Sequence, residues 1–307
     1  MAQDSLIKRF WLYQKERFPF LTHGLLITCF SFSAVSYSRI CRDATGFIEW
    51  EKFAICIFNT ITIFFLLRVF DEHKDAEDDA KYRSELPVPR GLISLKELRN
   101  IGLAVFFLQI IVNAITFPTM LWLYAGVMIY MSLMGKEFFV VEWLKKHQFW
   151  YVVSHMFIIP FVDVFASGFD WYLEGVSAPF GLLFFFAVSF MNGIVLEVGR
   201  KIRAPENEKE GVLTYSHLLG PQKSVWLWIA VLLATLGFAA AAAHYAHHGV
   251  VVYVVLTACF LLTLIPAISY LKSKSAKSAK AIEIASGLWT MAMYLTLGGI
   301  VKLIELI

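Results

Sequence analysis

Long apolar stretches recur along the whole chain, and they constrain its fold more than any other feature of the sequence. A helix that crosses a bilayer needs about 20 mostly apolar residues to span a hydrocarbon core of about 30 Å. Of the 307 residues, 58% are hydrophobic and only 17% are charged, which is too little charge for the surface of a soluble protein of this length. We therefore predict an all-α membrane protein. The apolar stretches give nine candidate spans, at residues 20–38, 51–70, 98–116, 118–135, 149–167, 177–197, 224–243, 249–271 and 283–304.

The nine expected helices form a single domain over residues 1–307, a bundle around a central cavity. The mixed-charge, amphipathic segment before the first span is expected to lie along the membrane interface. If the N-terminus is cytoplasmic and the helices alternate, all but four of the 27 Lys and Arg residues fall on the cytoplasmic side. This bias obeys the positive-inside rule and predicts a multi-pass integral membrane protein with a cytoplasmic N-terminus. The four exceptions are Arg39, Arg42, Lys52 and Lys302.

Two charged clusters interrupt the apolar pattern. The first cluster follows the second expected span and covers residues 67–94, with the sequence LRVFDEHKDAEDDAKYRSELPVPRGLIS. The second cluster follows the sixth expected span and covers residues 196–220, with the sequence LEVGRKIRAPENEKEGVLTYSHLLG. The orientation given above places both on the cytoplasmic face, where they can share one ligand. Carboxylates mixed with Lys and Arg at the mouth of a membrane helix suit a magnesium-bound diphosphate whose lipid tail lies in the bilayer.

In the first cluster, the key pair of carboxylates is Asp71 and Asp75. Four residues apart, they share one face of a helix, where a divalent cation would turn their repulsion into attraction. Four basic residues are candidates to bind the remaining phosphate oxygens: Lys74, Lys81, Arg83 and Arg90. The alternative is a solvated segment held by local ion pairs, such as Arg68 with Glu72 at helical spacing.

In the second cluster, a carboxylate stands at the membrane end of an expected helix, where a charge is costly and often functional. The ligand interpretation assigns Glu197, Glu206 and Glu208 to a metal, and Arg200, Arg203 and Lys209 to phosphate. The alternative pairs Glu197 with Lys201 at helical spacing and treats the RKIR run as a positive-inside anchor.

Taken together, the two clusters resemble the motifs of the UbiA superfamily of intramembrane prenyltransferases. The first motif of that family is N-D-x-x-D-x-x-x-D, and Asp71 and Asp75 match its last two aspartates. The Y-R-P-x-P-x-G stretch that follows is matched, with a small insertion, by Tyr82, Arg83, Pro89 and Gly91. The second cluster is similar to the chlorophyll-synthase form D-x-x-x-D-x-K-x-x-E-G-D-R followed by Gly and Ser or Thr. The matching residues are Glu197, Arg203, Glu206, Glu208, Lys209, Gly211 and Thr214.

This chain departs from the family pattern at three positions. Leu67 and Arg68 stand where the first motif has Asn and its first Asp, and Lys201 stands where the second motif has its second Asp. Two family carboxylates are therefore basic here. Arg68 and Lys201 are expected to hold the diphosphate directly, which leaves the number of metal ions open.

The resemblance implies a transferase that moves a prenyl group from an isoprenoid diphosphate to a lipophilic acceptor within the membrane, with Mg²⁺ as cofactor. Asp71, Asp75 and Glu197 would carry catalysis, and Tyr82 and the basic residues would bind substrate. A terpene cyclase of the same superfamily is one alternative, and a non-catalytic protein that binds or transports a lipid phosphate is another. Membrane lipid is an expected partner, and nucleic acid is not.

A few polar residues lie within the expected spans. Asn113, His155 and Asp163 are expected to face the interior of the bundle. Near the cytoplasmic end, His155 is a candidate to line the acceptor pocket, with a hydrogen-bonded packing role as the alternative. The HYAHH run at residues 244–248 is expected to be a solvated loop on the opposite side, and the four cysteines are expected to be free thiols.

Overall fold

The computed structural model describes residues 5–209, 211–300, 302 and 304, and in that part of the chain every regular element is helical. The α-helices are α1 (Leu6–Arg17), α2 (Phe20–Cys41), α3 (Trp50–Lys74), α4 (Ala76–Tyr82), α5 (Leu95–Thr116), α6 (Met120–Gly135), α7 (Val141–Lys146), α8 (Gln148–Met156), α9 (Ile158–Gly168), α10 (Leu182–Arg200), α11 (Tyr215–Leu219), α12 (Pro221–Tyr245), α13 (Val250–Ser273) and α14 (Ala276–Tyr294). Short 3₁₀ turns cover η1 (Glu137–Phe139) and η2 (Pro205–Asn207), and a π-helical segment, η3 (Leu295–Gly299), extends α14.

Seven helices of the described residues are long and apolar enough to cross a membrane, which confirms an all-helical membrane protein. They are α2, α3, α5, the α8–α9 pair, α10, α12 and α13. The span expected at 118–135 is the shorter helix α6, and the one expected at 283–304 begins within the more polar α14 and ends partly outside the described residues. Nine spans and a central cavity therefore remain predictions.

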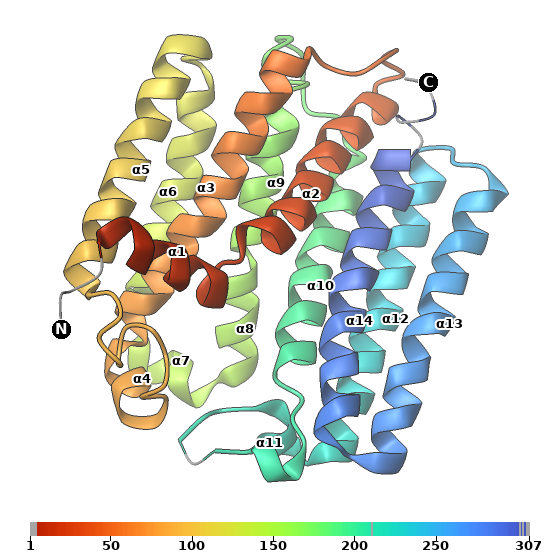
Figure 1. Ribbon diagram of the computed structural model, residues 1–307. Coiled ribbons are helices and arrows are strands. Elements are labelled where there is room, and N and C mark those ends of the chain that lie inside the picture. The colour runs from red at the N-terminus through yellow and green to blue at the C-terminus, as the bar shows by residue number, and fades with distance from the viewer. Residues whose placement is uncertain (1–4, 210, 301, 303, 305–307) are drawn as a thin grey trace.

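The helices form two groups, joined through α2 and by the direct contact of α9 with α10. On one side, α3, α5, α6 and α9 contact one another, and on the other side α10, α12, α13 and α14 do so (Figure 1). Helix α2 contacts α3 and α9 as well as α10 and α14, so it bridges the groups. The outward faces carry large exposed apolar side chains, such as Ile115 and Trp122, because their solvent is lipid rather than water.

The short helix α1 lies across the bundle near one of its ends (Figure 1). Its buried Tyr13 and the following Phe18 pack in a small core with Phe65 and Val69 of α3 and Leu98 of α5. Helix α1, which was expected to lie along the membrane interface, therefore also packs against the bundle.

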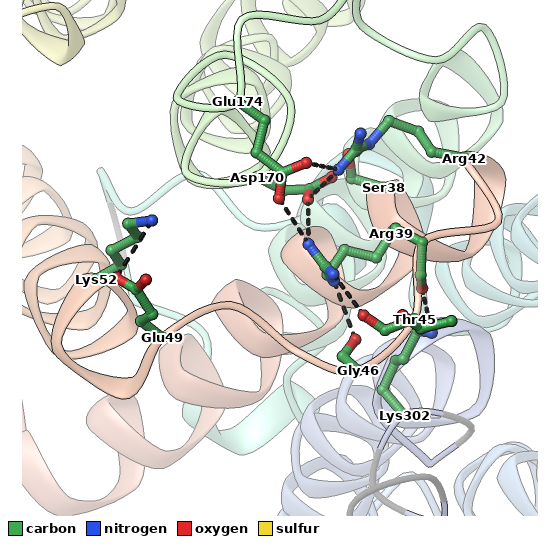
Figure 2. A network of polar contacts seen from close by, with 11 residues as sticks. Ser38, Arg39, Arg42, Thr45, Gly46, Glu49, Lys52, Asp170, Glu174 and Lys302 are labelled. Atoms are coloured by element: carbon green, nitrogen blue, oxygen red, sulfur yellow. Dashed lines mark hydrogen bonds and ion pairs between the residues drawn. The ribbon is translucent and has the colours of Figure 1, made fainter.

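At the opposite end, two of the few basic residues of that side, Arg39 and Arg42, are tied into a buried network, and Lys52 pairs separately with Glu49 (Figure 2). Arg39 and Arg42 both bind the fully buried Asp170, at 2.9 and 2.6 Å, and both reach Glu174. The hydrogen bonds that Arg42 donates to Asp170 and Glu174 raise the pKa of Arg42, although burial opposes this shift. The network fixes the end of α2 against the turn that follows α9.

Buried polar residues inside the bundle satisfy one another in the α3–α5 contact. Asn113 donates to Asn59 at 2.7 Å, and Gln109 accepts from Tyr124 at 2.8 Å. Asn113, His155 and Asp163 are all buried, as expected. The HYAHH run was expected to be a solvated loop. Its last residue, His248, is instead held by a contact of 2.7 Å between its ring and the carbonyl oxygen of Leu297. The four cysteines are free thiols.

Candidate functional site

The two charged clusters lie at the same end of the bundle and touch. Helices α3 and α10 both run toward that end, with α4 and α11 beyond them (Figure 1). Lys209 of the second cluster forms an ion pair with Glu85 of the first at 2.6 Å. Gly211 lies so close to the Tyr82 ring that a Cβ there would be 2.2 Å from a ring carbon. Arg200 interacts electrostatically with Asp71 and Asp75. The two clusters are therefore in contact, as a shared ligand would require.

The first cluster begins in the last turn of α3. The amide of Asp75 bonds to the carbonyl of Asp71, after which the backbone leaves the helix and restarts as α4. Asp71 is partly exposed and has only a long contact to Arg68, at 3.8 Å. No described residue donates a hydrogen bond or ion pair to the Asp75 carboxylate. Burial raises the pKa of Asp75, with Lys74 opposing this effect and the Asp71 charge adding to it.

Other carboxylates of the same cluster are structural anchors. Glu72 is buried and accepts from Arg17 at 2.6 Å and from Arg68 at 3.1 Å. Asp79, also buried, pairs with Arg83 at 3.0 Å and more distantly with Arg17. Arg68 and Arg83, expected to bind substrate, are therefore already engaged by carboxylates. The sequence does contain the Arg68–Glu72 spacing, but it gave no sign that Arg17 of α1 reaches this site.

In the second cluster, Glu197 is buried between two cations. Nε and Nη2 of Arg200 both donate to Oε2 of Glu197, Nε at 2.8 Å, and the Nζ of Lys201 lies 2.7 Å from Oε1. The helical ion pair that was the alternative interpretation is thus present. Glu197 would have to release these partners before it could bind a metal.

The loop after α10 is shaped by hydroxyl groups. Thr214 and Ser216 each donate to Glu208 at 2.6 Å, and the amide of Arg203 donates to Ser216 at 2.8 Å. A pocket of about 390 Å³ lies between this loop and the start of α14. Its lining includes Arg200, Arg203, Glu206, Glu208, Lys209, Lys280 and Glu283, and no residue of the first cluster.

The remaining expected site residues of the first cluster lie at its edge. Lys81 is exposed and sits over the Tyr82 ring at 4.7 Å. Arg90 pairs with Glu16 of α1 at 2.6 Å, on the outer side of the loop. This bond and the Glu16 charge raise the pKa of Arg90 despite some burial.

A third group of polar residues flanks the first cluster, and sequence reasoning mostly missed it. Lys74 donates to the Tyr151 hydroxyl at 2.7 Å and lies 3.5 Å from Glu137. His155 Nε2 lies 3.2 Å from the same carboxylate, and its Nδ1 lies 2.8 Å from the carbonyl of Tyr151. That carbonyl only accepts, so the contact at Nδ1 is a hydrogen bond that the ring donates.

Glu137 begins a backbone turn of unusual conformation. Glu137, Phe138 and Phe139 have φ of 49°, 52° and 61°, a left-handed region that non-glycine residues avoid. Burial acts to raise the pKa of the Glu137 carboxyl, but the His155 hydrogen bond and the Lys74 charge outweigh it and hold that pKa below 4.5. Strain of this kind persists where the surroundings fix it. No sequence signal marks the EFF turn.

The donor set suits one magnesium ion better than two. Mg²⁺ takes one or two carboxylates together with phosphate oxygens and water, and Asp71 and Asp75 offer two carboxylates without strong partners. The raised pKa of Asp75 reflects a buried negative charge that a cation would relieve. Among the described residues, no group of three or more His, Cys, Asp or Glu side chains is arranged to hold a metal by itself. The site therefore fits an ion that completes its shell with a diphosphate.

Sequence comparison identifies the family. The family described as "UbiA prenyltransferase family" matches residues 26–294, most of the chain. The chain belongs to the UbiA prenyltransferase family. It is therefore a multi-pass integral membrane protein of a family that transfers prenyl groups. No curated protein sequence matches the chain significantly.

Structural comparison agrees with this assignment at the level of the fold. The chain is similar to a solved structure reported for digeranylgeranylglyceryl phosphate synthase in membranes, with a TM-score of 0.59 and 15% sequence identity. The similarity covers 94% of this chain and 99% of the other. At this identity the likeness speaks for the shared architecture alone.

Proposed function

We propose that this UbiA-family protein transfers a prenyl group from an isoprenoid diphosphate to a lipophilic acceptor, with the diphosphate held between the two charged clusters. The observation that carries the proposal is their contact at one end of the bundle, through Lys209–Glu85 and Gly211–Tyr82. The relative named above makes a product that contains geranylgeranyl groups, which makes geranylgeranyl diphosphate the first donor to test.

In this proposal, Asp71 and Asp75 hold one Mg²⁺ on the diphosphate, and Arg200 and Lys201 face it from the second cluster. Bound there, the ion would neutralise the negative charge that develops on the leaving diphosphate. Arg200 and Lys201 add fixed positive charge, while Glu197 orients them by its two ion pairs. Lys74, fixed by Tyr151 and Glu137, contributes a third cation beside the aspartates.

The allylic carbon that loses the diphosphate needs an environment without water. Phe138 packs edge-on against both Tyr130 and His155 and closes the site near Lys74 with aromatic surface. The new bond forms between the acceptor and C1 of the prenyl group, the C1–O bond to diphosphate breaks, and a proton leaves the acceptor. We further propose that this end of the bundle is cytoplasmic, because nearly all basic residues gather there.

The test is an incubation of the purified protein with geranyl, farnesyl or geranylgeranyl diphosphate, MgCl₂ and a membrane-lipid extract, with products identified by mass spectrometry. A prenylated lipid together with released diphosphate is expected. Asp71→Ala should abolish diphosphate release, and Asp78→Ala, an exposed acid of the same cluster, should not. Products formed from the diphosphate alone would favour a terpene cyclase. Tight binding without turnover would favour a non-catalytic lipid-phosphate protein.

A further inference from the structure

A lateral groove runs along the outside of the bundle between α3, α5 and α6, apart from the contact between the two clusters. It consists of two adjoining hollows of about 730 and 380 Å³. They share the lining residues Phe70, His73, Phe106, Met128 and Ser132. Two of its three helices, α3 and α5, are long and apolar enough to cross a membrane, so the groove opens toward lipid.

The walls of the groove are apolar. Ile129 and Phe139 are 62% and 76% exposed in it, and Leu133 and Phe70 are also exposed. Gly135 lets the end of α6 approach α3 closely, since a Cβ there would lie 2.7 Å from the Phe70 ring. Such a surface is suited to a hydrocarbon chain.

The titratable residues that line the groove are all basic: His73, Lys74, Arg99 and Lys136. The two ring nitrogens of His73 contact the carbonyls of Val69 and Leu95, at 2.8 and 3.1 Å.

Arg99 and Lys136 have no ion pair with any described residue, unlike most arginines at this end of the bundle. The nearby carboxylates in the sequence, Glu97 and Glu137, are already bound by Arg9 and Lys74. Asp71 and Asp75 flank His73 and Lys74 on the chain, so the unpaired positive charge that lines the groove is that of Arg99 and Lys136.

We propose that this groove binds an anionic phospholipid of the bilayer, with an acyl chain along Phe70, Ile129 and Phe139 and the headgroup phosphate between Arg99 and Lys136. Charge complementarity selects the anionic headgroup, and the lateral opening selects a molecule that is already in the membrane. This inference does not depend on the proposed transferase reaction.

The test uses the full-length protein in nanodiscs of phosphatidylglycerol and phosphatidylcholine, with retained lipid measured by native mass spectrometry. We expect selective retention of phosphatidylglycerol, weakened about fivefold for each charge removed in Arg99→Gln/Lys136→Gln. The matched control is Lys145→Gln/Lys146→Gln, which removes two exposed lysines of α7 that do not line the groove. The control should retain the lipid as the wild type does.

A second arm tests the apolar part of the groove. Ile129→Trp should displace the bound lipid, whereas Ile115→Trp, at an equally lipid-exposed position of α5 outside the groove, should not. Equal retention of both lipids, or equal retention by the charge variants and their control, would overturn the proposal. So would retention of an isoprenoid lipid in place of phosphatidylglycerol, because that would assign the groove to a substrate.

Discussion

At the scale of single residues, the carboxylates of the first cluster divide into two kinds. Glu72 and Asp79 are buried and hold arginines, so their negative charge is compensated within the protein. Asp71 and Asp75 are not compensated in this way, and these are the two that match the family motif. The division separates the acids that stabilise the fold from those available to a ligand.

Asp75→Asn is expected to raise the melting temperature at neutral pH. The pKa of Asp75 is raised in the folded protein. The contribution of this side chain to stability is therefore fully present below its ordinary pKa of 3.8, and it is lost as the pH rises through the pKa of the folded state. The difference between variant and wild type should therefore close as the pH falls toward 3.8. Thermal unfolding in detergent between pH 4 and 8 measures it, and a constant difference would contradict the assigned cause.

The same variant tests the metal site without an activity assay. With inorganic diphosphate present, MgCl₂ at about 100 times its Kd should stabilise the wild type by about 2.7 kcal/mol. Asp75→Asn should lose most of that gain, while Asp78→Asn, which changes an exposed acid, should keep it. An unchanged magnesium response in Asp75→Asn would remove this residue from the metal site.

Glu72→Gln is expected to destabilise the protein by about 3 kcal/mol, because it leaves the partly buried Arg17 and Arg68 without the buried carboxylate that they share. Glu77→Gln, at an exposed position nearby, should change stability by less than about 0.5 kcal/mol. Thermal unfolding of the two variants provides the comparison. Equal melting temperatures would show that α1 is not anchored through Glu72.

At the scale of elements, the candidate site is formed by residues at the ends of helices. The first turn of α4 carries three acids, Glu77, Asp78 and Asp79, which favour the positive end of a helix dipole. Part of the acidic run that suggested metal binding is therefore explained by helix formation alone. On the other side, Gly211 has a φ of +74° and lies against Tyr82, so a glycine is required where the loops meet.

Gly211→Ala should therefore separate the two loops. The left-handed backbone costs an alanine about 1–2 kcal/mol, and the Tyr82 contact adds a steric clash. Gly220→Ala is the matched control, because its φ is +82° but nothing lies within 4 Å of the added Cβ. We expect both variants to melt lower, but only Gly211→Ala to raise the KM for the diphosphate donor.

The double variant Gly211→Ala/Tyr82→Ala separates the two causes. If the clash separates the loops, removing the Tyr82 ring should lower the donor KM relative to Gly211→Ala alone. A KM for Gly211→Ala equal to that of Gly220→Ala would mean that the contact between the loops does not shape the donor site.

At the scale of the whole molecule, much of the fold followed from hydropathy and charge. Apolar length predicted most of the spanning helices, and both charged clusters lie at one end as expected. The spans expected over α6 and α14 remain predictions, because α6 is shorter than the other apolar helices and α14 is more polar. The break between α8 and α9 was not predicted, because apolar runs do not reveal where a helix begins or breaks.

The candidate site was only partly predictable from the sequence. Motif spacing located Asp71, Asp75 and Glu197, but it could not show that Glu197 is already paired on both sides. The roles of Arg17, Glu137 and Tyr151 depend on contacts between residues 55 to 77 positions apart, or on a strained turn. Local sequence patterns do not reveal contacts between residues so far apart in the chain.

The arrangement of the whole bundle makes a last prediction, about its orientation in the membrane. In a variant lacking the four native cysteines, single cysteines at Lys81 and Lys209 should react together with a membrane-impermeant maleimide added from the cytoplasmic side. A cysteine at Asp43, in the exposed turn after α2 at the opposite end, should react only from the other side. The reason is that α3 and α10 both end in the charged clusters, and the positive-inside bias assigns that end to the cytoplasm. Labelling of right-side-out and inverted vesicles, read by gel shift, distinguishes the sides. Reaction of Lys81→Cys and Lys209→Cys from opposite sides would contradict the shared diphosphate site, whereas reaction of both from the outside would reverse only the orientation.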